Sequence, residues 1–229
     1  IMDVKQGNGI TLFTIPNIIT LVNLILGLLA IVHININKEL SYLLILGAAI
    51  SDVMDGFVAR LINQVSAIGR ELDSLADIIS FGVAPALLLI SNDVTNYILL
   101  GVSAVYVSCG ALRLARFNIC GTKEVFQGLP IPAAALLTSS AIMYIPMQYN
   151  VILVFIIAIL MISPVTYPSI KVVEGRKSVA ISSSFGIVFA LSLFIFYIFP
   201  SNFIILIAAI IFPMAFVYAF FSPIVFRLL

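Results

Sequence analysis

Charged residues are scarce in this sequence of 229 residues: only 9% are Asp, Glu, Lys or Arg, while 62% are hydrophobic. Ordinary globular chains carry about 25% charged and about 45–50% apolar residues, so the composition excludes a soluble domain. The formal net charge of +1 also excludes the strongly basic footprint of a nucleic-acid-binding protein. The two cysteines, Cys109 and Cys120, are too few for a disulfide framework or for a zinc site of their own, and we expect both to be reduced.

Long apolar runs are plentiful, and they predict membrane-spanning helices. Pro, Gly, Asn and charged residues divide the chain into runs near 16–36, 40–60, 66–90, 96–116, 130–147, 151–170, 178–199 and 202–226. Because a helix needs ~20 residues to cross the hydrocarbon, we expect an all-α integral membrane protein, a bundle of about eight transmembrane helices. The domain organisation that follows is an interfacial N-terminal segment at 1–15 and a single helical domain over 16–229.

The basic residues predict which way this bundle faces. If the N-terminus is cytoplasmic, every Lys and Arg except Lys38 falls on the cytoplasmic side or at a cytoplasmic helix end, which is the usual bias of membrane proteins. Because the chain has no Trp, interfacial anchoring falls to Tyr. The predicted outer boundary carries Tyr42, Tyr97, Tyr144, Tyr149 and Tyr197. Both signals predict that the two termini are cytoplasmic.

Carboxylates are few, and half of them lie in one stretch. Of ten acidic residues, five lie between positions 52 and 77, within two predicted membrane helices. Asp52 and Asp55 are three residues apart, and Asp73 and Asp77 are four apart, so each pair lies on one face of its helix. An antiparallel turn near 63–66 would place Asp52 level with Asp77 and Asp55 level with Asp73. We therefore expect all four carboxylates in one thin layer.

Four buried carboxylates at one depth need positive counterions. Two divalent cations (Mg²⁺, Mn²⁺ or Ca²⁺) would match their charge, prefer oxygen ligands and support phosphoryl transfer. Intramembrane acids also occur in ion pathways and in ion pairs, here with Arg60 or Arg70, so a divalent-cation transporter is the alternative of a different class. Against a transporter, the acids cluster at the predicted cytoplasmic end, and the outer halves of the second and third spans offer no further charged steps.

The spacing across this stretch resembles a known family signature. The string D-x2-D-G-x2-A-R-x8-G-x3-D-x3-D is formed by Asp52, Asp55, Gly56, Ala59, Arg60, Gly69, Asp73 and Asp77. It resembles the signature of the CDP-alcohol phosphotransferase family. The flanking segments LDSLADIISFGVAPALLL, CGALRLARFNI and GLPIPAAA are similar to the phosphatidylserine synthase branch of that family. The likeness runs from about Pro16 to Ala135.

The resemblance implies an enzyme that works by direct displacement. The hydroxyl of L-serine attacks the phosphatidyl phosphorus of CDP-diacylglycerol, or of an ether-lipid analogue, and CMP leaves. The metal ligands implied on this chain are Asp52, Asp55, Asp73 and Asp77. Asp77 is also the implied general base for the serine hydroxyl. The same likeness implies a homodimer. We expect the protein in a prokaryotic cell membrane, and the distribution of basic residues predicts that its active site faces the cytoplasm. The nearest alternative uses another alcohol, such as glycerol phosphate, inositol phosphate or choline.

Small and basic residues beside the acids are the first group of predicted substrate contacts. The resemblance implies that the CMP part lies against Gly56 and Ala59, and we expect Arg60 to contact the diphosphate. Gly69 lies one turn from Asp73 on the same side, where the lack of a side chain lets a ligand or another helix come close. Helix packing for the small residues, and cytoplasmic anchoring for the arginine, are the alternatives.

Polar residues of the first and fourth spans are the second group. Asn17 and Thr20 lie along one side of an apolar span, and a nucleotide contact is weighed there against helix–helix hydrogen bonds. Arg113 and Arg116 are three residues apart and are followed by Asn118. We predict that Arg113 and Arg116 bind the serine carboxylate or the lipid phosphate, because the planar Arg guanidinium matches planar oxyanions. Two anchoring arginines would give the same pattern.

Overall fold

The computed structural model describes residues 13–64, 66–120, 125–168 and 203–220, and this part of the chain is mostly helical. Four helices within it are long and apolar enough to cross a membrane: α1 (Ile15–His33), α2 (Lys38–Leu61), a continuous span over Ala67–Ile90 and α5 (Tyr97–Cys120). Shorter apolar helices follow, namely α6 (Ile131–Tyr144), α7 (Met147–Ile162) and α9 (Phe203–Phe220). The predicted all-α membrane architecture is confirmed at this level, while the count of about eight spans and the orientation of the termini stay predictions.

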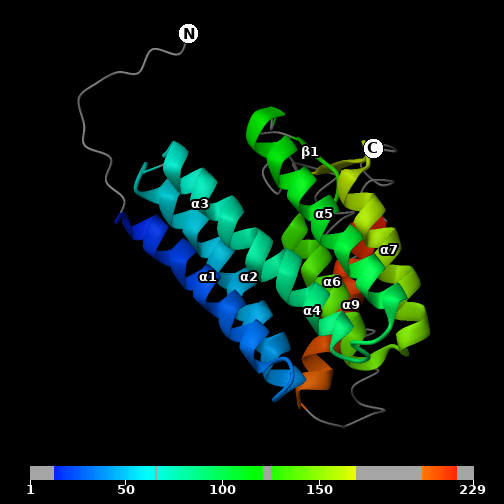
Figure 1. Cartoon of the computed structure of the whole chain (residues 1–229). Helices are drawn as coiled ribbons and strands as arrows, with labels where there is room; N and C mark the ends of the chain where they lie inside the picture. Colours follow the sequence, from blue (N-terminus) through cyan, green and yellow to red (C-terminus); the bar gives the residue numbers. More distant parts are fainter. Residues whose placement is uncertain (1–12, 65, 121–124, 169–202, 221–229) are drawn as a thin grey trace.

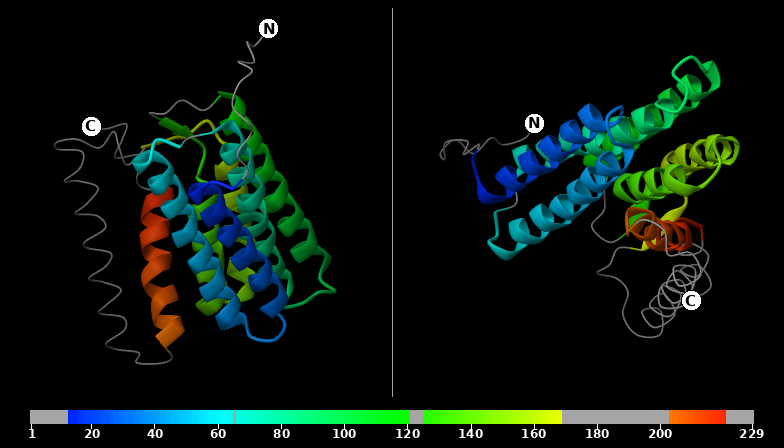
Figure 2. Two further views of the ribbon diagram at one scale, coloured as in Figure 1. Left: turned by 90° about the vertical axis from the view of Figure 1, so that its left-hand side faces the viewer. Right: turned by 90° about the horizontal axis from the view of Figure 1, so that it is seen from below.

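The helices form two groups that meet along the third span. α1 packs against α2 and against the span over Ala67–Ile90, and these helices lie side by side in Figure 1. α5 packs against α7, and α6 packs against both α7 and α9, as the view from below in Figure 2 also shows. The turn after α2, the last turns of α5 and strand β1 (Val125–Gln127) lie at the same end of the bundle. Among the described residues, Arg60, Arg70, Arg113 and Arg116, four of the basic residues predicted to be cytoplasmic, belong to the helix turns near this end.

The outward side of α1 is apolar. Ile18, Val22 and Ile25 are each about half exposed in the isolated chain, at 49%, 43% and 53%. Asn17, Thr20 and Asn23 of the same helix are buried against the rest of the bundle. This division is the reverse of that on a helix of a soluble protein and is the one that a lipid-facing helix requires.

Buried hydroxyl groups fasten α1 to its neighbours. Ser51 of α2 donates to the backbone carbonyl of Ile19 at 2.9 Å, and Ser80 donates to the carbonyl of Asn23 at 3.0 Å. Gly27 lets the helices approach this closely, because a Cβ atom there would collide with the backbone and side chain of Ser80. The first span is therefore held at a fixed depth beside the helices that carry the acids.

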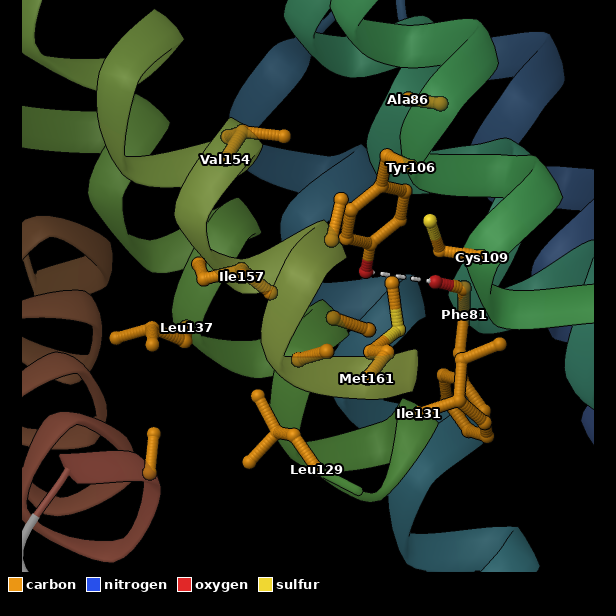
Figure 3. Close-up of a cluster of buried hydrophobic side chains, with 14 of the residues drawn as sticks. Phe81, Ala86, Tyr106, Cys109, Leu129, Ile131, Leu137, Val154, Ile157 and Met161 are labelled. Atoms are coloured by element: carbon orange, nitrogen blue, oxygen red, sulfur yellow. Dashed lines mark hydrogen bonds between the residues drawn. The ribbon is translucent and has the colours of Figure 1, made fainter. Parts of the chain in front are cut away.

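The third span contains a π-helical turn. It runs as α3 (Ala67–Asp77), η1 (Ile78–Val83) and α4 (Ala84–Ile90). Pro85 has no N–H group to donate to the carbonyl of Phe81, four residues earlier. The hydroxyl of Tyr106 on α5 donates to that carbonyl at 3.0 Å, the dashed line in Figure 3. An uninterrupted helix was expected over 66–90, and proline combined with a donor from another helix accounts for the difference.

The predicted helix over 151–170 is wrong in its second half. α7 ends at Ile162, and strand β2 (Thr166–Pro168) pairs antiparallel with β1. Ser163 is extended, with ψ at 156°, because the residue before a proline, here Pro164, is biased against the helical region. The helix predicted over 178–199 and nearly all of the interfacial segment predicted at 1–15 lie outside the described residues.

Candidate active site

Three carboxylates meet where α2 faces α3. Asp52 and Asp55 come from α2 and Asp73 from α3, and one oxygen atom from each lies within 4.8 Å of the others. Ser66 caps the start of α3 by accepting from the backbone N–H of Gly69 at 2.9 Å, which fixes the beginning of the helix that carries Asp73. The predicted antiparallel hairpin therefore brings together three of the four acids.

Asp55 is held from α1. Its side chain is 6% exposed, and the hydroxyl of Thr20 donates to its Oδ2 at 2.7 Å. A bond this short to a carboxylate is charge-assisted, so it orients the group strongly. This contact is an interhelical hydrogen bond, the alternative weighed for Thr20 from the sequence, and the predicted nucleotide contact of Thr20 stays a prediction.

Asp77 lies one turn further along α3 and is not a member of the group of three. It is 5% exposed, and the side-chain amide of Asn23 on α1 donates to its Oδ1 at 3.3 Å. Asp77 interacts electrostatically with Asp52 and Asp73, so all four acids share one electrostatic neighbourhood. Its predicted roles as metal ligand and general base stay predictions.

The cluster suits a hard divalent cation. Three carboxylate oxygens within one small space are the donor set that Mg²⁺, Mn²⁺ and Ca²⁺ prefer. Asp73 also has a buried Oδ1 atom without a hydrogen-bond partner in the described part of the chain. An unpaired buried carboxylate oxygen is unfavourable in a protein interior and becomes favourable when a cation binds it. The residues therefore fit the metal that the sequence predicted.

The two predicted arginines have different surroundings. Arg113 is 6% exposed, its guanidinium lies 5.5 Å from the centre of the Phe117 ring, and its Nε has no hydrogen-bond partner among the described residues. It interacts electrostatically with Asp77 of α3, and Tyr218 of α9 lies in the same neighbourhood. Tyr218 thus brings the last described helix to the site, which sequence reasoning missed because no motif marks α9.

Arg116 points to the backbone of other segments. Its Nη2 donates to the carbonyl of Gln127 at 2.8 Å and its Nη1 to that of Ile162 at 3.1 Å. Longer contacts from Nη2 reach the carbonyls of Met161 and Ser163. These carbonyls lie at the end of α7 and beside β1, so Arg116 ties both to α5. The contacts favour a structural role for Arg116, and its predicted grip on substrate remains a prediction.

Gly128 shows how tightly this junction is packed. It follows β1, has a φ of +78°, and a Cβ atom there would collide with the carbonyl of Met161 and approach Nη2 of Arg116 within 2.7 Å. Only glycine combines this backbone conformation with the lack of a side chain. The junction of α5, β1 and α7 is therefore tightly packed and leaves no room for a side chain at this position.

The remaining predicted contacts fall into two classes. Asn118 donates to Glu71 at 3.2 Å and to Ser74 at 3.1 Å, so it links α5 to α3. A Cβ atom on Gly69 would lie 3.0 Å from the buried Asn17 side chain, so this glycine allows α1 and α3 to approach. These are packing contacts, and substrate contacts by Asn17, Gly69 and Asn118 stay predictions.

The second class, which comprises Gly56, Ala59 and Arg60, has free space around it. A Cβ atom on Gly56 would meet only the Arg60 guanidinium, at 3.9 Å, among the described residues within 4 Å. Arg60 is exposed, and Ala59 is half-buried on the same helix. Free space beside a glycine and an exposed arginine is compatible with the predicted nucleotide and diphosphate contacts, which remain predictions.

The family model described as CDP-alcohol phosphatidyltransferase matches residues 13–165. A CDP-diacylglycerol–serine O-phosphatidyltransferase of Methanocaldococcus jannaschii is 46% identical, over 69% of this chain and 75% of its own length. The protein of that name from Bacillus subtilis is 39% identical, over 69% of this chain and 91% of its own. An archaetidylserine synthase of Methanothermobacter thermautotrophicus is 38% identical, over 68% of this chain and 70% of its own.

Proposed function

Because the chain belongs to the CDP-alcohol phosphatidyltransferase family, we propose that it is the enzyme that transfers the phosphatidyl group of a CDP-activated lipid to the hydroxyl of L-serine. The products are the serine phospholipid and CMP. The observation that carries the proposal is the cluster of Asp52, Asp55 and Asp73, which lies within the matched region. One relative is named for CDP-diacylglycerol and another for archaetidylserine, so we propose either an ester lipid or an ether lipid as the donor.

The reaction is a direct displacement at phosphorus. The serine oxygen forms a bond to the phosphatidyl phosphorus, the bond from that phosphorus to the CMP oxygen breaks, and the hydroxyl proton passes to the carboxylate of Asp77. Asn23 holds Asp77 through its amide, which keeps one carboxylate oxygen oriented while the other faces the reacting hydroxyl. Asp77 is buried, so it accepts the proton away from bulk water.

The carboxylates of Asp52, Asp55 and Asp73, with Asp77 as the fourth ligand of the proposal, would hold two divalent cations, Mg²⁺ or Mn²⁺ and alternatively Ca²⁺. When bound, the cations would polarise the diphosphate and stabilise charge on the departing phosphate. Thr20 keeps Asp55 oriented for this task. Gly56, Ala59 and Arg60 are the proposed contacts of the CMP diphosphate, and Arg113 of the serine carboxylate.

The setting of the site is part of the proposal. We place the protein in a prokaryotic cell membrane as a homodimer of chains with about eight spans each, one helical domain over 16–229 and both termini in the cytoplasm. In this orientation the acid cluster opens toward cytosolic serine and CMP. The end of the bundle that carries Arg60, Arg70 and the last turns of α5 is then the cytoplasmic end.

A single assay tests the proposed function. Purified protein is supplied with a CDP-lipid, Mg²⁺ or Mn²⁺, and in turn L-serine, glycerol phosphate, inositol phosphate and choline, and CMP release is measured. We expect release with L-serine, its loss in Asp73→Asn and its retention in Asp93→Asn, an exposed acid of the loop between α4 and α5. Faster CMP release with another alcohol would mean that this alcohol, and not serine, is the acceptor.

A further inference from the structure

Two polar side chains that flank Asp77 are buried and incompletely paired. Asn23 is 0% exposed and Arg113 is 6% exposed. Oδ1 of Asn23 and Nε of Arg113 have no hydrogen-bond partner in the described part of the chain. A buried polar atom without a partner costs about 1–3 kcal/mol, so a ligand that pairs both atoms gains binding energy from them.

The orientation of the Asn23 amide is fixed by its neighbour. Nδ2 donates to Oδ1 of Asp77 at 3.3 Å. If the amide were flipped, its oxygen would face the carboxylate oxygen, and two acceptors would oppose each other. Oδ1 of Asn23 is therefore a hydrogen-bond acceptor that is directed away from Asp77.

The hydrogen-bond donor, Nε of Arg113, comes from a different helix. Arg113 belongs to α5 and interacts electrostatically with Asp77, whereas Asn23 belongs to α1. The proposed base is thus accompanied by one neutral acceptor and one cationic donor from two different helices. This combination is complementary to a zwitterion that carries a hydroxyl group, because an ammonium group needs acceptors and a carboxylate needs donors.

We propose that Asn23 is a specificity-determining residue whose Oδ1 accepts a hydrogen bond from the α-ammonium group of the acceptor, while Arg113 Nε donates to its α-carboxylate. This assignment rests on the proposed function. An α-amino acid carries both groups on its α-carbon, and in serine the reacting hydroxyl is on the adjacent β-carbon. With both ends held, that hydroxyl is directed at Asp77.

Two truncated acceptors separate the contributions of the two groups. Ethanolamine retains the hydroxyl and the ammonium group but lacks the carboxylate, and 3-hydroxypropanoate retains the hydroxyl and the carboxylate but lacks the ammonium group. A residue that binds the ammonium group increases the preference for serine over 3-hydroxypropanoate. It does not change the preference for serine over ethanolamine, because both carry that group. A residue that only supports Asp77 affects all three acceptors alike.

The experiment compares kcat/KM for the three acceptors in the parent protein, in Asn23→Leu and in the matched control Ser41→Ala. Leu is close to Asn in size and has no acceptor. Ser41 is a buried hydroxyl on α2 that donates to the carbonyl of Ala30, far along the helix from the acids. Where 3-hydroxypropanoate is not turned over, its inhibition constant against L-serine replaces kcat/KM. Asn23→Ala provides the same comparison if Asn23→Leu does not fold.

We expect Asn23→Leu to lower the preference for serine over 3-hydroxypropanoate about tenfold or more, which is the usual effect of one lost hydrogen bond to a charged group. The preference for serine over ethanolamine should stay unchanged, and Ser41→Ala should change neither. Equal losses for all three acceptors would overturn the assignment and leave Asn23 only as a support of Asp77. A parent protein that releases no CMP with L-serine would overturn the proposed function itself, and this assignment with it.

Discussion

Replacing Arg116 by Lys should destabilise the protein without impairing serine binding. The guanidinium makes two short bonds, to the carbonyls of Gln127 at 2.8 Å and Ile162 at 3.1 Å, from different nitrogen atoms. A lysine keeps the charge and has three N–H donors, but its one nitrogen cannot occupy both guanidinium positions, so the two bonds cannot both keep their geometry. One carbonyl loses its donor at the junction of α5, β1 and α7.

The size of the effect follows from one lost charge-assisted bond. Such a bond contributes about 1.5–3 kcal/mol. For a chain of this length 1 kcal/mol corresponds to about 2–4 °C, so the melting temperature should fall by about 3–12 °C. The longer contacts of Arg116 to Met161 and Ser163 are weak by geometry and add little.

The assay pairs thermal unfolding in detergent with the serine KM at a temperature where both proteins are folded. Arg113→Lys is the matched comparison, because the same substitution there should raise the serine KM about tenfold or more through loss of the Nε donor. A tenfold rise in serine KM for Arg116→Lys, with an unchanged melting temperature, would refute the structural role and restore Arg116 to the substrate site.

Further predictions concern the acids and the topology. Thr20→Val removes the donor to Asp55, so the divalent-cation concentration for half-maximal thermal stabilisation should rise about tenfold; an unchanged midpoint would mean that the bond does not orient a metal ligand. Asp77→Asn should bind CDP-lipid but not release CMP, because an amide cannot take the proton, and loss of both would mark a ligand only. Cysteine at Asn92 should be labelled from outside the cell and cysteine at Gln64 should not, whereas the reverse pattern would invert the topology.

The acid cluster could be predicted because helical geometry is local. Asp52 and Asp55 share a face by their spacing alone, and a short turn fixes the register of the next helix, so the approach of Asp73 follows from the sequence. The same reasoning placed Asp77 in the layer, but the structure gives it a separate partner, Asn23. From the sequence, Asn23 stands out only as a polar residue on an apolar span, and nothing there pairs it with Asp77.

The tertiary partners of the arginines could not be predicted. Arg113 and Arg116 share a face of α5, and a sequence pattern treats them alike. Their surroundings differ because Pro164 ends α7 beside one of them, while Tyr218, more than a hundred positions away, lies near the other. The π-helical turn has the same origin: Pro85 frees a carbonyl, but its new donor comes from a different helix.

In the proposed reaction, carboxylates of α2 and α3 hold divalent cations without which CDP-lipid does not react with serine. The most direct measurement is CMP release by the purified protein, with serine and divalent cation each omitted and then restored after treatment with excess chelator. We predict release only when both are present, and recovery on adding Mg²⁺ or Mn²⁺ back. Full release in excess chelator would show that the reaction does not need a divalent cation.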